Sequence, residues 1–165
     1  MRIMVASDSH SGISYMRRWA QLLRPQVILH LGDYYDDGKT LEELFPATRV
    51  IQVPGNCDQF RCLDFAPLKI FTQLEGLNIY MTHGHRERVK SGTAELEHMA
   101  RTAGANIALY GHTHVAEFHT TSDGMLILNP GSCGSSGGSV ALLELNCGRI
   151  DQCRILRLAD MEEFE

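Results

Sequence analysis

Carboxylate, amide and imidazole side chains follow each of five short apolar runs in this sequence. The runs cover 3–6, 27–31, 50–53, 77–81 and 107–110, and runs of this kind predict buried β-strands. The polar segments after them contain seven side chains able to bind a metal ion: Asp8, His10, Asp33, Asn56, His83, His112 and His114. In a wound α/β sheet the carboxyl ends of the strands open into one crevice, so we expect these side chains to meet there. The sequence therefore predicts a shared metal site.

The number and chemistry of these candidate ligands favour two ions over one. A single ion rarely takes seven mixed nitrogen and oxygen donors, whereas a bridging Asp33 would give each of two ions four protein ligands. Imidazole and carboxylate donors without thiolate suit Mn²⁺, Fe, Zn²⁺ or Ni²⁺. Two divalent ions with Asp8, Asp33 and a bridging hydroxide leave a net charge of about +1, which favours an anionic substrate.

The elements that must position these side chains alternate between strand and helix through the first two-thirds of the chain. Apolar residues at helical spacing predict helices over 13–23, 40–45 and 91–103. Pro25, Pro46 and Gly104 mark where these helices end. A weaker strand over 68–74 is expected to pair with the run at 77–81.

Beyond residue 114 the pattern changes to short strands joined by turns. These strands are predicted over 115–121, 125–128, 140–145 and 150–156. Turn residues such as those at 122–124 between them predict an antiparallel meander. So many strands with only three or four helices favour an α/β fold in which two mixed β-sheets pack face to face with helices outside.

Length and composition are those of one globular domain. The 165 residues are 44% hydrophobic and 21% charged, and a chain of this size folds without a disulfide or a structural metal. Much of the net charge of -5 comes from the last eight residues, which hold four acidic side chains and no basic one. We therefore expect a single domain over 1–157 and a solvated acidic tail over 158–165. The near-neutral remainder argues against a nucleic-acid partner.

The cysteines and the apolar segments indicate the compartment. Five cysteines, an odd number without a Cys-x-x-Cys pair, fit free thiols in a reducing environment. The first apolar run is too short for a signal peptide, and no run approaches the roughly 18 apolar residues that span a membrane. We expect a cytoplasmic protein without a membrane partner. The oligomeric state stays open, a homo-oligomer included.

Together these segments resemble the motif set of the calcineurin-like metallophosphoesterases, and most closely the small single-domain phosphodiesterase branch that includes the retromer subunit Vps29. The motifs are Asp8-x-His10, Gly32-Asp33, Gly55-Asn56-Cys57-Asp58, Thr82-His83-Gly84-His85, Gly111-His112-Thr113-His114 and Asn129-Pro130-Gly131-Ser132. The resemblance implies a four-layer αββα sandwich with a dinuclear metal centre. It places the first ion on Asp8, His10, Asp33 and His114, and the second on Asp33, Asn56, His83 and His112.

The resemblance also implies a reaction, the hydrolysis of a small phosphodiester by in-line attack of a hydroxide that bridges the two ions. Mn²⁺ is the expected metal, with Fe, Ni²⁺ and Zn²⁺ as alternatives. Asp58 is expected to orient a ligand or a water beside the metals. Phosphatase branches carry a histidine that protonates the leaving group where this chain has Cys57, and a neutral thiol is a poor acid. His85 is the candidate substitute, with a supporting hydrogen bond as its other role, so diesters with good leaving groups are favoured.

The sequence leaves other functions open. The main alternative is a non-catalytic scaffold like Vps29, although Vps29 has altered metal positions and this chain keeps every ligand. A nuclease is a third hypothesis, against which the near-neutral charge argues. The Gly-x-Ser-x-Gly pattern at 134–138 does not predict a serine hydrolase, because no histidine follows it. That segment is expected to be a loop, flexible or wrapped around phosphate.

Charged residues beside the motifs have a plainer interpretation. Asp36 and Asp37 are expected in a solvated turn, with a contribution to the rim of the site as the less favoured role. Arg86, Arg88 and Lys90 are expected to be a solvated charge run, with attraction of an anion as their other role. His30 is expected to be an ordinary packed or surface residue.

Overall fold

The computed structural model describes residues 1–58, 66–134 and 138–164. Its strands are β1 Arg2–Ala6, β2 Val27–His30, β3 Arg49–Gln52, β4 Lys69–Leu74, β5 Leu77–Thr82, β6 Ile107–Leu109, β7 Glu117–Thr120, β8 Leu126–Asn129, β9 Ser139–Asn146 and β10 Arg149–Arg157. Its helices are α1 Ile13–Leu23, α2 Tyr35–Leu44 and α3 Ala94–Thr102, with 3-10 helices η1 Asn56–Asp58, η2 Val89–Ser91 and η3 Leu158–Phe164. Sheet A has the order β10-β9-β1-β2-β3, and sheet B the order β4-β5-β6-β8-β7.

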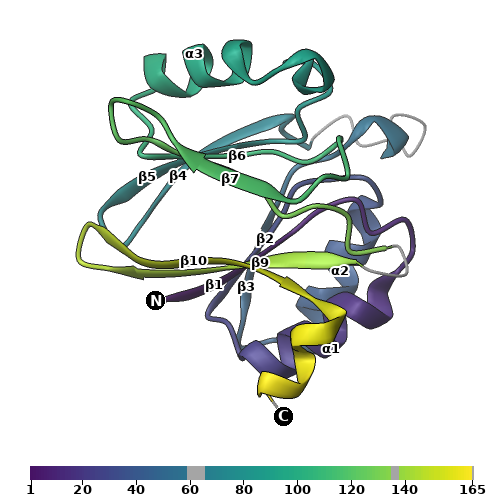
Figure 1. Cartoon of the computed structure of the whole chain (residues 1–165). Coiled ribbons are helices and arrows are strands. Elements are labelled where there is room, and N and C mark those ends of the chain that lie inside the picture. Colours follow the sequence, from purple (N-terminus) through teal and green to yellow (C-terminus); the bar gives the residue numbers. More distant parts are fainter. Residues whose placement is uncertain (59–65, 135–137, 165) are drawn as a thin grey trace.

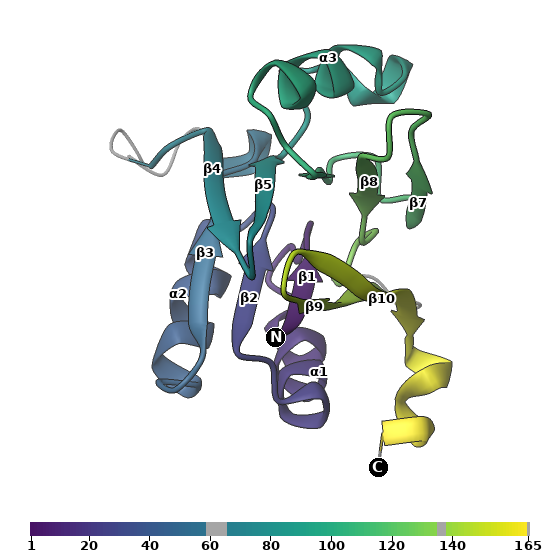
Figure 2. The ribbon, with the colours of Figure 1, turned by 90° about the vertical axis from the view of Figure 1, so that its left-hand side faces the viewer.

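The two sheets stack face to face, with helices on both outer sides (Figure 1 and Figure 2). Along β1, Ile3 and Val5 belong to the core between the sheets, while Met4 and Ala6 face the helices. This alternation follows from the two-residue period of a strand. Helices α1 and α2 pack on the outer face of sheet A and α3 packs on that of sheet B, which confirms the predicted αββα sandwich.

The parallel strands bring the candidate site together. Strands β1, β2 and β3 run parallel in sheet A, and β5, β6 and β8 run parallel in sheet B. Each group therefore delivers its carboxyl ends to one edge of its sheet. The five predicted apolar runs are β1, β2, β3, β5 and β6, each within a residue or two of the expected bounds. The loops after these strands carry all seven candidate ligands.

The last four strands form two separate hairpins, and not the single antiparallel meander that the sequence predicts. Strand β7 pairs antiparallel with β8 in sheet B, and β9 pairs antiparallel with β10 in sheet A. Strand β8 also lies parallel to β6, and β9 lies antiparallel to β1. Both hairpins were predicted from their turns. The connection between them crosses from one sheet to the other, and local turn chemistry does not say which sheet a hairpin joins.

Helix α2 begins at Tyr35 rather than at Thr40, so Asp36 and Asp37 lie in its first turn; the Asp36 side chain is solvated, and Asp37 is half-buried. The N–H groups of Tyr34 and Tyr35 donate to Asp58 Oδ1 at 3.0 and 2.9 Å. A carboxylate from a separate loop therefore caps the helix, since the first N–H groups of a helix have no partner within it.

The acidic C-terminal segment packs on the domain. Met161 of η3 is 5% exposed, and the Phe164 ring meets the edge of Trp19 in α1 with centroids 5.9 Å apart. The side chains of Glu162 and Glu163 remain exposed. Two of the acidic side chains are thus solvated, while η3 contributes apolar contacts to the domain. The segment that follows the predicted boundary at residue 157 therefore covers part of α1.

The cysteines of the described residues carry no disulfide. Cys57, Cys133, Cys147 and Cys153 are free thiols, and Cys62 lies outside the described residues. Residues 135–137 of the predicted phosphate-binding or flexible loop also lie outside them. Within the described ranges, no helix combines the length and hydrophobicity that crossing a membrane requires.

Candidate metal centre

Four of the predicted ligands form a compact cluster. Asp8 and His10 follow β1, Asp33 follows β2 and His114 follows β6, and one ligand atom of each lies within 4.8 Å of the others. The Nε2 atoms of His10 and His114 are 3.3 Å apart. His114 Nε2 lies 3.1 Å from Asp8 Oδ1, and His10 Nε2 lies 3.9 Å from Asp33 Oδ2. These four residues are the set expected to hold the first ion.

The carboxylate of Asp8 fits a bound cation. Its Oδ2 accepts hydrogen bonds from Ser7 Oγ at 2.6 Å and from the His112 N–H at 3.0 Å. Its Oδ1 is buried and has no hydrogen-bond partner in the described part of the chain, so the approach of His114 Nε2 lacks hydrogen-bond geometry. Burying a carboxylate oxygen without a partner is costly. A divalent cation in the cluster would satisfy both this oxygen and the imidazole lone pairs.

His83 and Asn56 form part of a second group. His83 is buried, and its Nδ1 lies 2.7 Å from the carbonyl oxygen of Leu31. A ring nitrogen this close to a carbonyl carries a proton, so in the neutral imidazole the lone pair lies on Nε2, which is the tautomer that metal ligation requires. Nε2 lies 3.1 Å from Asn56 Oδ1, which is also an acceptor. Two acceptors facing each other fit a cation bound beside both.

His112 completes this second group. Its ring centroid is 5.2 Å from that of His83, at an interplanar angle of 62°. Burial, followed by the neighbouring His83 ring, lowers the pKa of His112 to about 4. The imidazole is therefore neutral at pH 7, and a metal ion would not have to displace a proton from it.

Asp33 lies between the two groups. Its Oδ1 is 3.5 Å from His83 Nε2, and its Oδ2 faces His10. The Cys57 N–H donates to Oδ1 at 2.9 Å. Burial opposes ionisation of this carboxyl, but His83 and the Cys57 N–H outweigh it and lower the pKa of Asp33 below its usual range. An ionised carboxylate with one oxygen toward each group has the position that a bridging ligand needs.

The backbone of these loops is unusual. Most of the seven candidate ligands have a positive φ: Asp8 (54°), His10 (44°), Asp33 (56°), His112 (67°) and His114 (61°). Few non-glycine residues adopt this region, and those that do cluster at functional sites, where surrounding contacts hold the strain. The loops are therefore shaped around the side chains they present.

Two glycines let neighbouring loops close on the carboxylates. A Cβ on Gly55 would overlap Asp33 Oδ1, and a Cβ on Gly111 would overlap Ser7 Oγ and approach Asp8 Oδ2 to 2.7 Å. Only glycine leaves space for the backbone at these two positions. The glycines of the motifs thus have a direct geometric purpose.

Asp58 and His85, the other two predicted site residues, lie beside the cluster. Asp58 Oδ2 accepts from the Gly55 N–H at 2.8 Å while its Oδ1 caps α2, so the described contacts of Asp58 position loops and do not touch the candidate ligands. The His85 ring centroid lies 5.4 Å from that of His83. Burial and His83 lower the pKa of His85, so its neutral form dominates at pH 7. His85 Nδ1 is buried without a partner among the described residues.

Cys57 occupies the place where the phosphatase branches carry histidine. Its side chain is exposed, and its Sγ accepts a hydrogen bond from Asn56 Nδ2 at 3.5 Å. Desolvation, together with the carboxylate of Asp33, raises the pKa of Cys57 to about 11. The thiol is therefore neutral at pH 7 in the metal-free chain and is a weak acid.

Several residues that organise the site were not predicted. Asn129 Nδ2 donates to Gly111 O at 3.2 Å and to Thr113 Oγ1 at 2.8 Å, which fixes the His112 loop. Ser132 Oγ donates to Asp8 O at 2.8 Å. Asn129 and Ser132 belong to a motif quoted for the family resemblance, which assigned them no role. Asp37 accepts hydrogen bonds beside His10, and no sequence signal distinguished it from Asp36.

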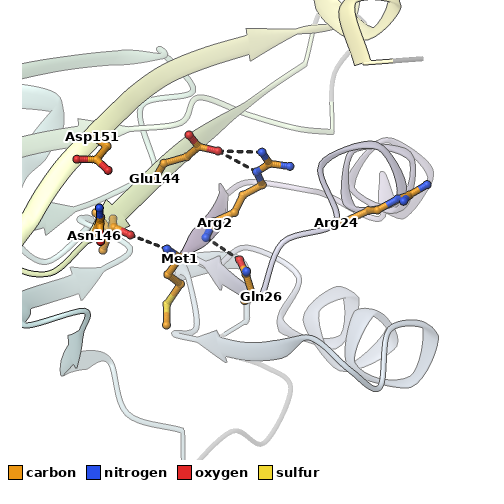
Figure 3. Close-up of a pocket in the computed structure, with 8 residues that line it drawn as sticks. Met1, Arg2, Arg24, Gln26, Glu144, Asn146 and Asp151 are labelled. Carbon is orange, nitrogen blue, oxygen red and sulfur yellow. Dashed lines mark hydrogen bonds and ion pairs between the residues drawn. The ribbon is translucent and has the colours of Figure 1, made fainter.

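A separate pocket lies at the opposite ends of β1 and β2 and is lined by Met1, Arg2, Arg24, Gln26, Glu144, Leu145, Asn146 and Asp151 (Figure 3). Its polar groups are largely paired with each other. Arg2 and Glu144 form an ion pair at 2.9 Å, and the Arg2 N–H donates to Gln26 Oε1 at 2.6 Å. The N-terminal amine donates to Leu145 O at 2.5 Å. These pairings stabilise the start of β1 and leave the strand-end cluster as the candidate site.

Comparison with known proteins agrees with this geometry. Residues 1–148 match the calcineurin-like phosphoesterase superfamily domain. A phosphodiesterase of Methanocaldococcus jannaschii is 26% identical over 147 residues, which are 81% of this chain and 84% of that protein. A predicted phosphoesterase of Streptococcus pneumoniae has a similar structure, with a TM-score of 0.72, 24% identity and coverage of 94% of this chain and 97% of its own. Vps29 of Entamoeba histolytica in complex with Zn²⁺ superposes with a TM-score of 0.69 at 21% identity, over 96% of this chain and 98% of that one.

The chain belongs to the calcineurin-like phosphoesterase superfamily, in the small single-domain branch whose structures include Vps29. This confirms the family resemblance found in the sequence. Its family is that of the metallophosphoesterases, hydrolases that bind divalent metal ions, and the cluster of Asp8, His10, Asp33 and His114 is the candidate metal site of this chain.

Proposed function

We propose that the protein is a dinuclear-metal phosphodiesterase. Asp8, His10, Asp33 and His114 hold the first ion, and Asp33, Asn56, His83 and His112 hold the second. The observation that carries this proposal is the position of Asp33, with one oxygen toward His83 and the other toward His10. Mixed imidazole and oxygen donors suit Mn²⁺, Fe, Ni²⁺ or Zn²⁺, and we propose Mn²⁺ as the metal.

When bound, two such ions activate a water for in-line attack on phosphorus and stabilise the charge on the attacking and leaving oxygens. The chain orients this chemistry through its own contacts. Asp58 holds the loops that present Asp33 and Asn56. Leu31 O fixes the ring of His83.

We propose that the substrate is a small phosphodiester with a good leaving group. Cys57 is a neutral thiol and offers little help to an alkoxide. His85 lies beside His83 and contacts the leaving group as a hydrogen-bond donor or as its acid. The M. jannaschii relative that is named a phosphodiesterase supports a diester. Free thiols favour a reducing, cytoplasmic location, and the near-neutral body disfavours a nucleic-acid substrate.

Hydrolysis of bis-p-nitrophenyl phosphate tests the proposal. Purified protein loaded with Mn²⁺ is expected to cleave this diester faster than p-nitrophenyl phosphate, a monoester. His83→Ala is expected to abolish the activity, whereas His98→Ala, on the exposed side of α3, retains it. A preference for the monoester would overturn the assignment as a diesterase.

A scaffold function like that of Vps29 is the second candidate, supported by the structural likeness to Vps29. The complete set of candidate ligands favours the enzyme, because a scaffold does not require it. Folded, metal-loaded protein that is inactive with Mn²⁺, Ni²⁺, Fe²⁺ and Zn²⁺ alike would favour the scaffold. In that case the partner would be a protein.

A further inference from the structure

Asp37, in the first turn of α2, contacts the loop that carries His10. Its Oδ2 accepts hydrogen bonds from Ser9 Oγ at 2.6 Å and from the Ser11 N–H at 3.1 Å. Ser9 and Ser11 are the two neighbours of His10 along the chain. One carboxylate oxygen therefore holds both neighbours of this histidine, Ser9 by its side chain and Ser11 by its main chain.

The His10 loop needs such support. Asp8, His10 and Ser11 have φ angles of 54°, 44° and 66°, a strained region for side chains of this kind. Strain of this type persists only where surrounding contacts fix the conformation. The His10 side chain is 34% exposed, and its ring contacts are with Tyr34 and His114 at the surface. Core packing therefore does little to fix this ring, and the hydrogen bonds to Asp37 supply the constraint.

The Ser9 hydroxyl that contacts Asp37 also lies beside Asp33. Ser9 is buried, and its Oγ lies 3.1 Å from the main-chain oxygen of Asp33 and 3.5 Å from His30 Nε2. Asp37 lies in the first turn of α2, which begins shortly after Asp33 in the chain. The start of α2, the Asp33 loop and the His10 loop thus meet at one serine hydroxyl.

We propose that Asp37 is a positioning residue for the half of the metal centre that contains Asp8, His10, Asp33 and His114. The inference rests on the proposed function, because it presupposes an ion at these residues. Asp37 acts through Ser9 and Ser11, which keep the imidazole of His10 directed at His114. In the described part of the chain the side-chain hydrogen bonds of Asp37 go to the His10 loop and to none of Asn56, His83 and His112, so Asp37 affects the second ion only through the shared Asp33.

Titration calorimetry of Mn²⁺ into metal-free protein tests this inference. Asp37→Ala removes the shared acceptor and is expected to weaken one of the two Mn²⁺ sites about 10-fold or more, while the other stays within about twofold. Asp37→Asn retains an oxygen acceptor and is expected to restore wild-type binding. Asp36→Ala is the matched control, since it removes a carboxylate of the same helical turn that pairs with Lys39 at the surface.

Double variants identify the weakened site. With His10→Ala the first site is already impaired, so Asp37→Ala is expected to add no further loss of Mn²⁺ affinity. With His83→Ala the ion that remains is expected to bind more weakly when Asp37→Ala is added. Circular dichroism establishes that each variant is folded. If Asp37→Ala does not fold, Ser9→Ala replaces it, because it removes only one of the two hydrogen bonds and is expected to weaken the same site.

Wild-type affinity at both sites in Asp37→Ala, or equal weakening of both, would overturn the inference. A wild type that binds a single Mn²⁺ would overturn the two-ion function alone. The inference then requires that His10→Ala abolish this binding and that Asp37→Ala weaken it, and it fails otherwise. A wild type that binds no metal would overturn both.

Discussion

The imidazoles of His10 and His114 face each other across the candidate site, with their Nε2 atoms 3.3 Å apart although 104 residues separate them in the chain. Each ring also approaches a carboxylate, His114 at Asp8 and His10 at Asp33. Nitrogen lone pairs at this distance repel unless a proton or a cation lies beside them. A cation beside them would also contact Asp8 Oδ1, which is buried without a hydrogen-bond partner in the described residues, so metal binding should stabilise the folded chain.

Mn²⁺ is expected to raise the melting temperature, and EDTA to lower it. An ion at 100 times its Kd adds about 2.7 kcal/mol to the free energy of unfolding, which corresponds to about 5–10 °C for a domain of this size. Differential scanning calorimetry with and without metal measures the shift. His114→Ala should reduce it, and His98→Ala, on the exposed side of α3, should not. An equal shift in both variants would mean that Mn²⁺ binds elsewhere.

Gly55→Ala is expected to remove most of the metal-dependent activity. The added Cβ overlaps Asp33 Oδ1, so the carboxylate must move away from its position between the two groups of ligands. Overpacking of this kind also costs about 1–3 kcal/mol of stability. Gly148→Ala is the control, because its φ of 79° gives a backbone cost in open space far from the site. Loss of activity in Gly55→Ala alone, measured as kcat/KM at a temperature where both variants are folded, would support the geometry.

The metal-free protein is expected to lose stability as the pH falls from about 6.5 to 4. The pKa of His112 is about 4 in the folded chain and near 6.5 when unfolded, so the unfolded state binds more protons in this window. Stability therefore rises with pH across it. Because the ring is partly exposed, we expect a contribution of only about 1 kcal/mol. Urea unfolding in EDTA measures the slope, and His112→Gln should make it shallower; an unchanged slope would contradict this assignment.

Lys69→Met is expected to destabilise the fold by about 2–4 kcal/mol. Lys69 Nζ pairs at 3.0 Å with Glu87 Oε1, and the side chain of Glu87 is 1% exposed. Removal of the cation leaves a buried carboxylate with the Thr82 hydroxyl as its hydrogen-bond donor. Chemical denaturation measures the loss, and adding Glu87→Gln should recover much of it. A double variant as unstable as the single one would show that packing of the lysine stem, and not its charge, is responsible.

Much of the fold could be predicted because its signals are local. The apolar runs that became β1, β2, β3, β5 and β6 are short and bounded by glycine or polar residues. Helix α1 has buried residues at regular helical spacing, Met16, Trp19, Ala20 and Leu23. The start of α2 was missed because its capping acceptor, Asp58, lies in another loop and Gly38 interrupts the pattern. The placement of β9 beside β1 was missed for the same reason, since it depends on contacts between distant segments.

The candidate site was predicted from a topological rule rather than from any single motif. The rule states that the residues after parallel strands lie at one edge of the sheet. It therefore predicts that Asp33, His83 and His114 meet, without information on side-chain directions. It could not identify Asp37, which lies inside a helix and contacts the His10 loop through hydrogen bonds. The positive φ angles of the ligand residues were equally hidden, because non-glycine residues seldom adopt them.

The division of the candidate ligands between the sheets has a mechanical consequence. Asp8, His10, Asp33 and Asn56 follow strands of sheet A, whereas His83, His112 and His114 follow strands of sheet B. Each of the two proposed ions takes ligands from both sheets. A bound ion would therefore cross-link the two layers at one end of their shared apolar interior. Parting of the layers and escape of the ion would then be a single event, so amide protons of that interior should exchange at a rate tied to metal release.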